Sequence, residues 1–242
     1  MKEPVETLLF DFGGTLDADG VAWKERFYAL YRAEGLDMTA DTFESSFFAA
    51  DSPLVGRLAP ATDLAGTVQA LVANLEAELT RRGAATDTAG TAAEGGNDAR
   101  GRRVASRFLA EASAAFARNR PVLEALRERY RLGVVSNFYG NLEAVCRGAG
   151  LASLFAALVD SHRVGAEKPD PAIFQAALAT LNARPETTVL VGDSLRRDRE
   201  GARRTGMRFI WITPPAAGAR ASAEVPAEHT VTELRDLVKI LQ

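Results

Sequence analysis

The chain has 242 residues, 47% of them hydrophobic and 25% charged, with a formal net charge of −3. This length suits one or two domains, since a domain usually holds about 100–200 residues. The near balance of 29 basic and 32 acidic residues argues against a nucleic-acid partner, which needs a basic surface. One cysteine and two histidines exclude a disulfide framework and argue against a zinc site.

The N-terminal apolar run around Leu8, Leu9 and Phe10 is too short, and its surroundings too acidic, for a signal peptide. No stretch approaches the roughly 18 consecutive apolar residues of a membrane helix. We therefore expect a cytoplasmic protein with no membrane partner.

Five short apolar segments have the length of buried strands. The first runs from Val5 to Phe12, and the others are 132–135, 157–159, 188–191 and 207–212. Helical patterns lie between and after them, at 121–129, 141–149, 171–181, 195–205 and 232–241, the last with Thr232 as its expected cap. Strands that alternate with helices predict a parallel sheet covered on both faces, in a doubly wound, Rossmann-like α/β core.

Residues 18–120 break this alternation and are mostly helical in pattern. The expected helices are 21–34, 41–50, 62–82 and 102–118. We therefore predict a helical cap domain at 18–120, inserted into an α/β core domain formed by 1–17 and 121–242. Segment 83–101 has no large apolar residue and is expected to be a flexible loop.

Small polar or acidic residues follow the predicted strands, where ligands bind in a doubly wound sheet. They are Asp11, Ser136, Asn137 and Asp193, with Asp198 a few residues later. Carboxylates at one rim repel one another unless a cation lies among them, and an all-oxygen set suits Mg²⁺. Lys168, one of only four lysines among the 29 basic residues, would add a positive charge there.

Taken in order, these segments resemble the four motifs of the haloacid dehalogenase-like (HAD) hydrolase superfamily. The matching segments are DFGGTL at 11–16, VVSN at 134–137, Lys168-Pro169, and Gly192-Asp193-Ser194 with Asp198. The helical insertion is similar to the cap of the dehalogenase and phosphoglycolate phosphatase branch, and the resemblance covers nearly the whole chain. It implies a Mg²⁺-dependent phosphohydrolase for a small phosphorylated metabolite.

The resemblance also implies roles for individual residues. Asp11 would be the nucleophile and form an aspartyl-phosphate, with Ser136 and Lys168 as further catalytic residues. Mg²⁺ would be held by Asp11, Asp193 and the carbonyl of Gly13, and supported by Asp198. The phosphoryl oxygens would be bound by hydroxyl, amide and ammonium donors of Gly14, Thr15, Ser136, Asn137 and Lys168.

The chain departs from the family pattern at Gly13, where phosphatases carry a second Asp that protonates the leaving oxygen and later activates water. The loss of such a group typically costs about 10²–10⁴-fold in rate. We therefore expect slow hydrolysis, least impaired for good leaving groups such as those of acyl or aryl phosphates. Asp17 and Asp19 lie nearby, but the sequence connects neither with the leaving group.

Other functions stay open. A metal-independent 2-haloacid dehalogenase also lacks the second Asp, although such enzymes usually carry an uncharged residue in place of Asp193. Phosphonate-cleaving relatives use a cap lysine as a Schiff base, but the surroundings of Lys24 do not support that role. A catalytically degenerate member would bind a ligand or partner without needing a nucleophile, metal ligands and a phosphate lysine together. The sequence specifies neither the substrate nor the oligomeric state.

The cap and the single cysteine have simple structural interpretations. Trp23, Phe27 and Tyr31 recur at helical spacing, which predicts a face in the core of the cap rather than a substrate wall. We expect Lys24 to be exposed and Cys146 to have no chemical role.

Overall fold

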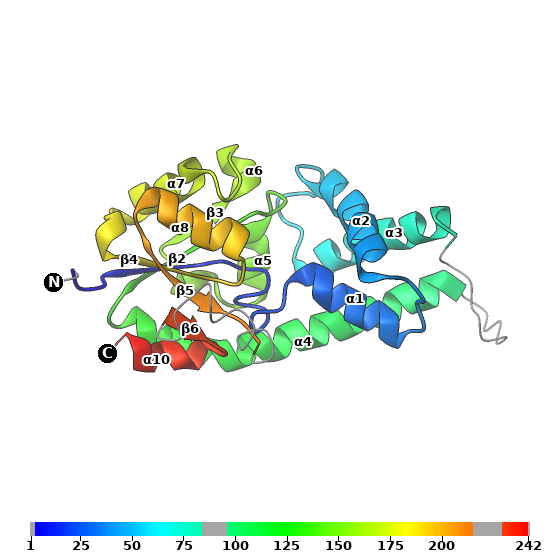
Figure 1. Cartoon of the computed structure of the whole chain (residues 1–242), viewed down its shortest axis with the longest axis horizontal. Helices are drawn as coiled ribbons and strands as arrows, with labels where there is room; N and C mark the ends of the chain where they lie inside the picture. The colour runs from blue at the N-terminus through cyan, green and yellow to red at the C-terminus, as the bar shows by residue number, and fades with distance from the viewer. Residues whose placement is uncertain (1–2, 84–95, 215–228, 242) are drawn as a thin grey trace.

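The structure, a computed structural model, describes residues 3–83, 96–214 and 229–241 (Figure 1). These residues form one six-stranded parallel sheet in the order β3-β2-β1-β4-β5-β6. Its strands are β1 (Thr7–Phe10), β2 (Arg131–Ser136), β3 (Ala157–Asp160), β4 (Thr188–Gly192), β5 (Arg208–Ile212) and β6 (Thr230–Val231). At its centre, Phe10 of β1 is paired with Val134 of β2 and Val191 of β4. The predicted doubly wound α/β sheet is confirmed.

The central strands are apolar because helices cover both faces of the sheet. All four residues of β1 and all five of β4 are buried. Leu9 packs on the face covered by α7 (Pro171–Leu181) and α8 (Glu200–Thr205). Leu8 and Phe10 pack on the other face, against α5 (Leu142–Gly148), the C-terminal part of α4 (Gly96–Arg127), η6 (Leu234–Asp236) and α10 (Leu237–Ile240). Short helical turns complete the core: η2 (Ala152–Leu154), α6 (Ser161–Val164) and η3 (Pro185–Thr187).

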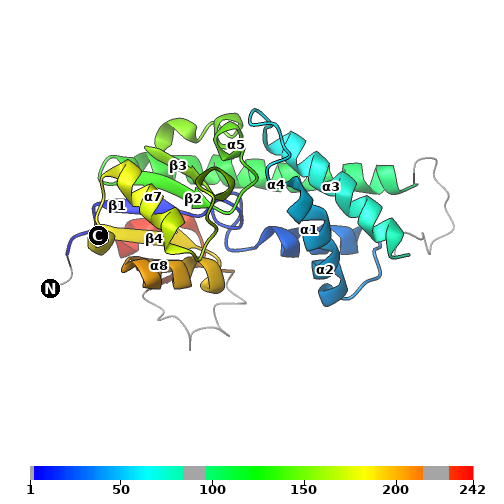
Figure 2. The same cartoon turned by 90° about the horizontal axis from the view of Figure 1, so that it is seen from above.

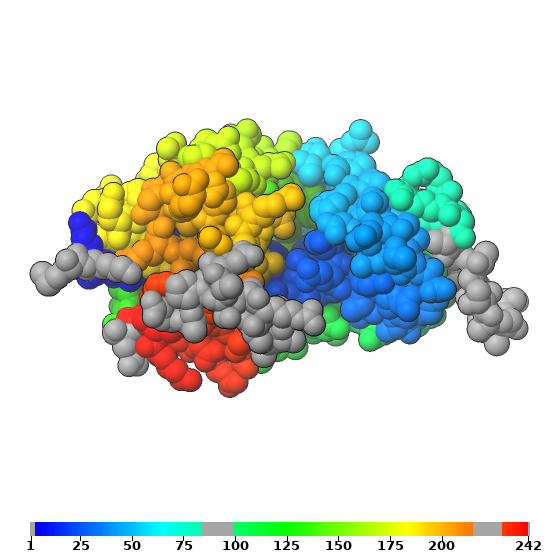
Figure 3. Space-filling view, viewed as in Figure 1, coloured from blue at the N-terminus to red at the C-terminus, as the bar shows by residue number. Residues whose placement is uncertain are grey.

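A group of helices lies beside the sheet, between β1 and β2 in the chain (Figures 1 and 2). It consists of α1 (Trp23–Ala33), α2 (Ala40–Asp51), η1 (Ser52–Leu54), α3 (Leu64–Arg81) and the N-terminal part of α4. We call it the cap. In the space-filling view its blue and cyan helices meet the yellow and orange core (Figure 3). One apolar cluster runs from the sheet into the cap, since Leu8 and Phe27 belong to it together.

The structure contradicts the prediction of two helices at 102–118 and 121–129. They are one helix, α4, with Pro121 inside it, so the expected domain boundary at 120–121 falls within a helix. Buried side chains recur on one face of α4 before and after the proline: Val104, Phe108, Ala112, Phe116, Leu123 and Leu126. This continuous packing outweighs the cost of about 3 kcal/mol for an interior proline. Of the loop expected at 83–101, residues 84–95 lie outside the described residues and 96–101 are helical.

Two other expected helices differ in form. The segment 232–241 holds only the short turns η6 and α10 instead of one helix that begins after Thr232. The segment 195–205 starts as a π-helix, η4 (Leu195–Arg199), before α8. In η4 the amides of Asp198 and Arg199 both donate to the Ser194 carbonyl, at 2.8 and 3.2 Å. This widened turn brings the Asp198 carboxylate back to the Ser194 amide, at 3.0 Å. Among the described helices, none has the length and apolar character to cross a membrane.

Candidate active site

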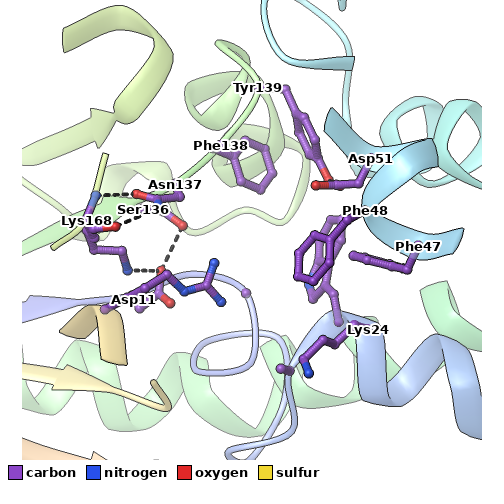
Figure 4. A pocket seen from close by; sticks show the side chains of 14 residues that line it. Asp11, Lys24, Phe47, Phe48, Asp51, Ser136, Asn137, Phe138, Tyr139 and Lys168 are labelled. Carbon is purple, nitrogen blue, oxygen red and sulfur yellow. Dashed lines mark hydrogen bonds and ion pairs between the residues drawn. The ribbon is translucent and has the colours of Figure 1, made fainter. Parts of the chain in front are cut away.

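Side chains from four segments of the chain meet at or beyond the carboxyl ends of the strands. Asp11 follows β1, Ser136 ends β2, and Lys168 lies between α6 and α7. Asp198 comes from η4, which follows β4. Figure 4 shows Asp11, Ser136 and Lys168 pointing toward one another. The structure therefore brings together side chains that the order of strands predicted at one rim.

Asp11 has one carboxylate oxygen that is saturated and one that is free. Its Oδ1 accepts hydrogen bonds from the Phe12 amide at 2.7 Å and the Ser136 hydroxyl at 2.8 Å. The Lys168 ammonium lies 2.7 Å from the same oxygen. These donors orient the carboxylate and stabilise its charge. Within the described part of the chain no donor is bonded to Oδ2, so Oδ2 is available to a substrate or a cation.

Lys168 is a fixed, buried cation between two carboxylates. Its Nζ lies 2.7 Å from Asp11 Oδ1 and 2.6 Å from Asp198 Oδ1, and only 1% of its side chain is exposed. Burial alone lowers the pKa of Lys168, but the charges of Asp11 and Asp198 outweigh this effect, and the pKa is raised. Asn137 orients the loop, because its Oδ1 accepts from the Lys168 amide at 2.7 Å and its Nδ2 donates to the Lys168 carbonyl at 3.2 Å.

Asp11, Asp193 and Asp198 form an acidic cluster, in which one oxygen of each lies within 4.8 Å of the others. Asp193 Oδ1 is buried and has no hydrogen-bond partner among the described residues. Burial, together with the charges of Asp11 and Asp198, raises the pKa of Asp193 well above its ordinary value. Lys168 is paired with the other two carboxylates, and among the described residues none forms a direct ion pair with Asp193, although the charges of Lys168 and Arg197 act against the rise of its pKa. An all-oxygen donor set with one unpartnered oxygen fits a hard divalent cation such as Mg²⁺.

Gly14 and Thr15, the predicted phosphate-binding residues of the loop after β1, do not line the pocket. The Gly14 amide donates to Asp17 Oδ1 at 2.7 Å, and the Thr15 amide donates to the Phe12 carbonyl at 3.2 Å. Both amides are therefore occupied within the protein. Gly14 has a geometric role instead: its φ is +87°, and a Cβ there would lie 2.6 Å from Asp193 Oδ2.

A pocket of about 100 Å³ opens beside Asp11, between the core and the cap (Figure 4). The core contributes the polar side chains of Asp11, Ser136, Asn137, Lys168 and Arg197, together with Gly13. The cap and the loop after β2 contribute Ala22, Trp23, Lys24, Phe47, Phe48, Asp51, Phe138 and Tyr139. The pocket is therefore polar and charged on one side and mostly aromatic on the other.

The aromatic side was not predicted from the sequence. Phe27 and Tyr31 are buried in the cap as expected, but Trp23, on the same helix face, lines the pocket. A usable signal was the pair Phe47-Phe48, because adjacent residues of a helix cannot both point into one core. Phe47 is 4% exposed and Phe48 is 45% exposed.

Asp51, at the end of α2, is another pocket residue that the sequence did not indicate. Its Oδ1 accepts a hydrogen bond from the Tyr139 hydroxyl, which joins the cap to the loop after β2. Burial raises the pKa of Asp51, although the hydrogen bond from Tyr139 acts in the opposite direction. Burial and the neighbouring Asp51 carboxylate raise the pKa of Tyr139 as well.

Asp17 connects the loop after β1 to the cap and does not reach the pocket. Besides the Gly14 amide, its carboxylate accepts from Trp23 Nε1 at 2.7 Å and Arg26 Nη1 at 2.8 Å. The side chain of Asp17 is wholly buried, and that of Arg26 is 6% exposed. Arg26 continues the link to α4, since its guanidinium lies 3.8 Å from the centre of the Phe108 ring. This buried ion pair fixes the orientation of Trp23.

Comparisons with known proteins agree on one family. A sequence profile described as "haloacid dehalogenase-like hydrolase" matches residues 5–206. Haloacid dehalogenase-like hydrolase domain-containing protein 3 of Bos taurus is 37% identical over 121 residues, which cover 49% of this chain and 48% of that protein. Phosphoserine phosphatase of Thermus thermophilus is 38% identical over 90 residues, 37% and 36% of the two chains. Glyceraldehyde 3-phosphate phosphatase of Pyrococcus furiosus is 31% identical over 127 residues, 50% and 51% of the two. The chain thus spans about half or less of the length of these relatives.

Solved structures with the same fold extend over nearly the whole chain. The HAD hydrolase YfnB from Bacillus subtilis, described as bound to magnesium, has a TM-score of 0.55 at 20% identity and covers 99% of this chain and 100% of its own. The L-2-haloacid dehalogenase RSc1362 has a TM-score of 0.59 at 22% identity, with coverage of 99% and 100%. At these identities the likeness establishes the fold.

Proposed function

The chain belongs to the haloacid dehalogenase-like hydrolase family and is a hydrolase, and from that premise we propose that it cleaves a small phosphorylated substrate through a covalent phosphoryl intermediate on Asp11. The proposal includes a cap formed by residues 18–120, in the manner of the capped phosphatase branch, and a glycine at position 13 in place of the usual acid. Two relatives bear phosphatase names, which supports transfer of a phosphoryl group as the reaction.

The observation that carries the proposal is the environment of Asp11. A buried carboxylate held by three donors on one oxygen, with the second oxygen free, is an oriented nucleophile. Lys168 borders the same pocket and has a third ammonium hydrogen to donate to an oxygen of a phosphoryl group next to Asp11, whereas the Ser136 hydroxyl donates to Asp11 itself. Fixed donors of this kind stabilise the charge that develops during phosphoryl transfer.

The reaction has two steps. The Asp11 carboxylate bonds to phosphorus, and the bond from phosphorus to the leaving oxygen breaks, with its electron pair passing to that oxygen. Water then attacks the aspartyl-phosphate, releases phosphate and a proton, and restores the carboxylate. Lys168 holds its charge beside Asp11 throughout, and Ser136 orients the attacking carboxylate through its 2.8 Å hydrogen bond.

The residues that would hold a magnesium ion are Asp11, Asp193 and Asp198, with Gly13 contributing its carbonyl. A bound Mg²⁺ would reduce the repulsion between the anionic phosphate and the anionic nucleophile. The buried, unpartnered Oδ1 of Asp193 supports this site. It also argues against a metal-independent dehalogenase, in which an unpaired buried carboxylate would have no use.

The experiment compares hydrolysis of acetyl phosphate and p-nitrophenyl phosphate with Mg²⁺ and with EDTA, by wild type and Asp11→Asn. Asp37→Asn is the matched control, because the Asp37 side chain is 95% exposed. We expect metal-dependent turnover that Asp11→Asn reduces by at least about 10³-fold and the control leaves unchanged.

Three results would contradict the proposal. Hydrolysis that survives Asp11→Asn would exclude the covalent intermediate. Absence of any hydrolysis, together with halide release from 2-chloropropionate in EDTA, would establish the dehalogenase alternative. Mg²⁺ binding by calorimetry without any turnover would favour a binding protein.

A further inference from the structure

The space beside Gly13, two residues after Asp11, is filled by an indole ring. A Cβ on Gly13 would lie 3.1 Å from Trp23 Nε1 and 3.3 Å from Trp23 Cδ1. Trp23 is held there, because its Nε1 donates to Asp17 at 2.7 Å and its ring packs edge-on against Phe108, with centroids 5.1 Å apart. The pocket wall next to the nucleophile is therefore an aromatic edge rather than a carboxyl group.

The remainder of the cap-side wall has the same character. Its aromatic rings come from α1, α2 and the loop after β2: Trp23, Phe47, Phe48, Phe138 and Tyr139. Phe48 is 45% exposed, so its ring is accessible to a ligand (Figure 4). Of the pocket-lining residues that the structure describes, only Asp11 and Asp51 carry a carboxyl group. Asp51 is hydrogen-bonded to Tyr139 on the side of the pocket opposite Asp11.

This wall limits which leaving groups depart readily. The leaving oxygen takes the electron pair of the broken bond, and the wall beside Asp11 offers it no carboxylic acid proton. A leaving oxygen that is stable as an anion is therefore favoured. A phenol has a pKa of about 10, whereas water, and with it an aliphatic alcohol, has a pKa of about 15.7, so a phenol leaves more readily than an aliphatic alcohol. An aromatic ring also packs well against the rings of the wall.

Resting on the phosphohydrolase function above, we propose that the substrate is the phosphate ester of a small phenol. The phosphate lies at Asp11, Ser136 and Lys168, and the ring packs against Trp23 and Phe48. The pocket, at about 100 Å³, is smaller than the cavity of about 150 Å³ that holds benzene, so the ring lies partly outside it, along the half-exposed Phe48. Asp11 bonds to phosphorus, the bond from phosphorus to the aryl oxygen breaks, and the aryloxide takes a proton from water. A second water then yields phosphate, a proton and free Asp11.

Four substrates separate the contribution of the ring from that of leaving-group acidity. Phenyl phosphate has both a ring and an acidic leaving group, benzyl phosphate has only the ring, acetyl phosphate has only the acidic leaving group, and glycerol phosphate has neither. We expect the highest kcat/KM for phenyl phosphate. Benzyl phosphate should compete with it for binding but turn over at least about 10²-fold more slowly.

Phe48→Ala tests the ring site without disturbing the core, because the Phe48 side chain is half exposed. We expect the ratio of kcat/KM for phenyl phosphate to that for acetyl phosphate to fall about 10-fold, mainly through KM. Val238→Ala is the matched control, since Val238 is an exposed apolar residue, 38% exposed, far from the pocket. The control should leave the ratio unchanged.

Failure of this inference differs from failure of the proposed function. If acetyl phosphate is hydrolysed with dependence on Asp11, but glycerol phosphate equals phenyl phosphate, the aryl class is wrong and the phosphohydrolase stands. An unchanged ratio in Phe48→Ala would likewise overturn the ring site. If none of the four substrates is hydrolysed, the proposed function fails, and this inference fails with it.

Discussion

The two sides of the pocket are built in opposite ways. On the core side, Asp11, Ser136, Lys168 and Asp198 are buried and joined by short polar contacts of 2.6 to 2.8 Å. On the cap side, aromatic rings meet at centroid distances of 5.0 to 6.4 Å, and Phe48 is half exposed. Polar contacts at those distances require fixed positions, whereas ring contacts tolerate displacement. The core side thus holds the reacting groups in fixed positions, and the cap side can contact ligands of different shape.

The strongest test of the fixed side is Lys168→Met, which leaves two buried carboxylates without their cation. We expect a loss of about 3–5 kcal/mol in the free energy of unfolding, measured by urea denaturation in EDTA, and loss of phosphatase activity. Lys239→Met is the control, because its side chain is 81% exposed and lies 3.6 Å from Asp236. A Lys168→Met protein as stable as the control would show that the carboxylates do not depend on this lysine.

The sequence predicted the core side because chain order alone places the ends of parallel strands at one rim. Asp11 and Ser136 follow directly from that rule, and the scarcity of lysine drew attention to Lys168. The cap side depends on how α1 and α2 pack over the sheet, which involves contacts between distant residues. Neither Asp51 nor Tyr139 belongs to a local pattern that reveals its partner. The helix break predicted before Pro121 is wrong for the same reason, because buried side chains on both sides of this proline outweigh its tendency to end a helix.

Asp17→Asn tests the link between the two sides. The substitution keeps one acceptor oxygen in place of two, whereas Gly14 donates to Asp17 Oδ1 and Trp23 to Oδ2. It also removes the 2.8 Å counter-charge of the buried Arg26 guanidinium and leaves that group its longer pair with Glu111, at 3.7 Å. We expect a loss of about 2–4 kcal/mol of unfolding free energy, together with a raised KM for phenyl phosphate because Trp23 is less firmly held. Asp19→Asn serves as the comparison, because its pair with Arg118 is partly exposed, at 28% and 52%. Equal stability of the two variants would refute the role of Asp17.

Asp51→Asn tests the cap side through the pH dependence of stability. Burial raises the folded-state pKa of Asp51 above its ordinary 3.8, so the protonated form is favoured by folding. The protonated Asp51 side chain therefore contributes to stability fully below pH 3.8, and this contribution is lost as the pH rises through the folded-state pKa. Asn does not ionise, so the variant should lose less stability than wild type between pH 4 and 7, measured as Tm. Asp41→Asn, on an exposed position of the same helix, should behave as wild type.

The smallest expected effect concerns the reactivity of the Cys146 thiol, which does not line the pocket. Burial, with the charge of Glu143, raises the pKa of its thiol to about 12. Ellman's reagent at pH 8 should therefore react slowly with the native protein and rapidly in urea. Ser153→Cys, which places a thiol on an exposed position of the core, should react at once. Rapid reaction of native Cys146 would indicate that α5 opens readily.

Helix α4 has a consequence for exchanging substrate specificity between relatives. It packs against α1 and α3 at one end and against β2 and η6 at the other, without interruption at Pro121. A chimera that swapped residues 18–120 would join two foreign half-helices in the middle of a shared hydrophobic stripe. The natural joint lies after Arg127, in the three residues before β2 begins at Arg131. Recombination there transplants the cap with its full supporting helix, and the recipient sheet must then be redesigned where that helix crosses it.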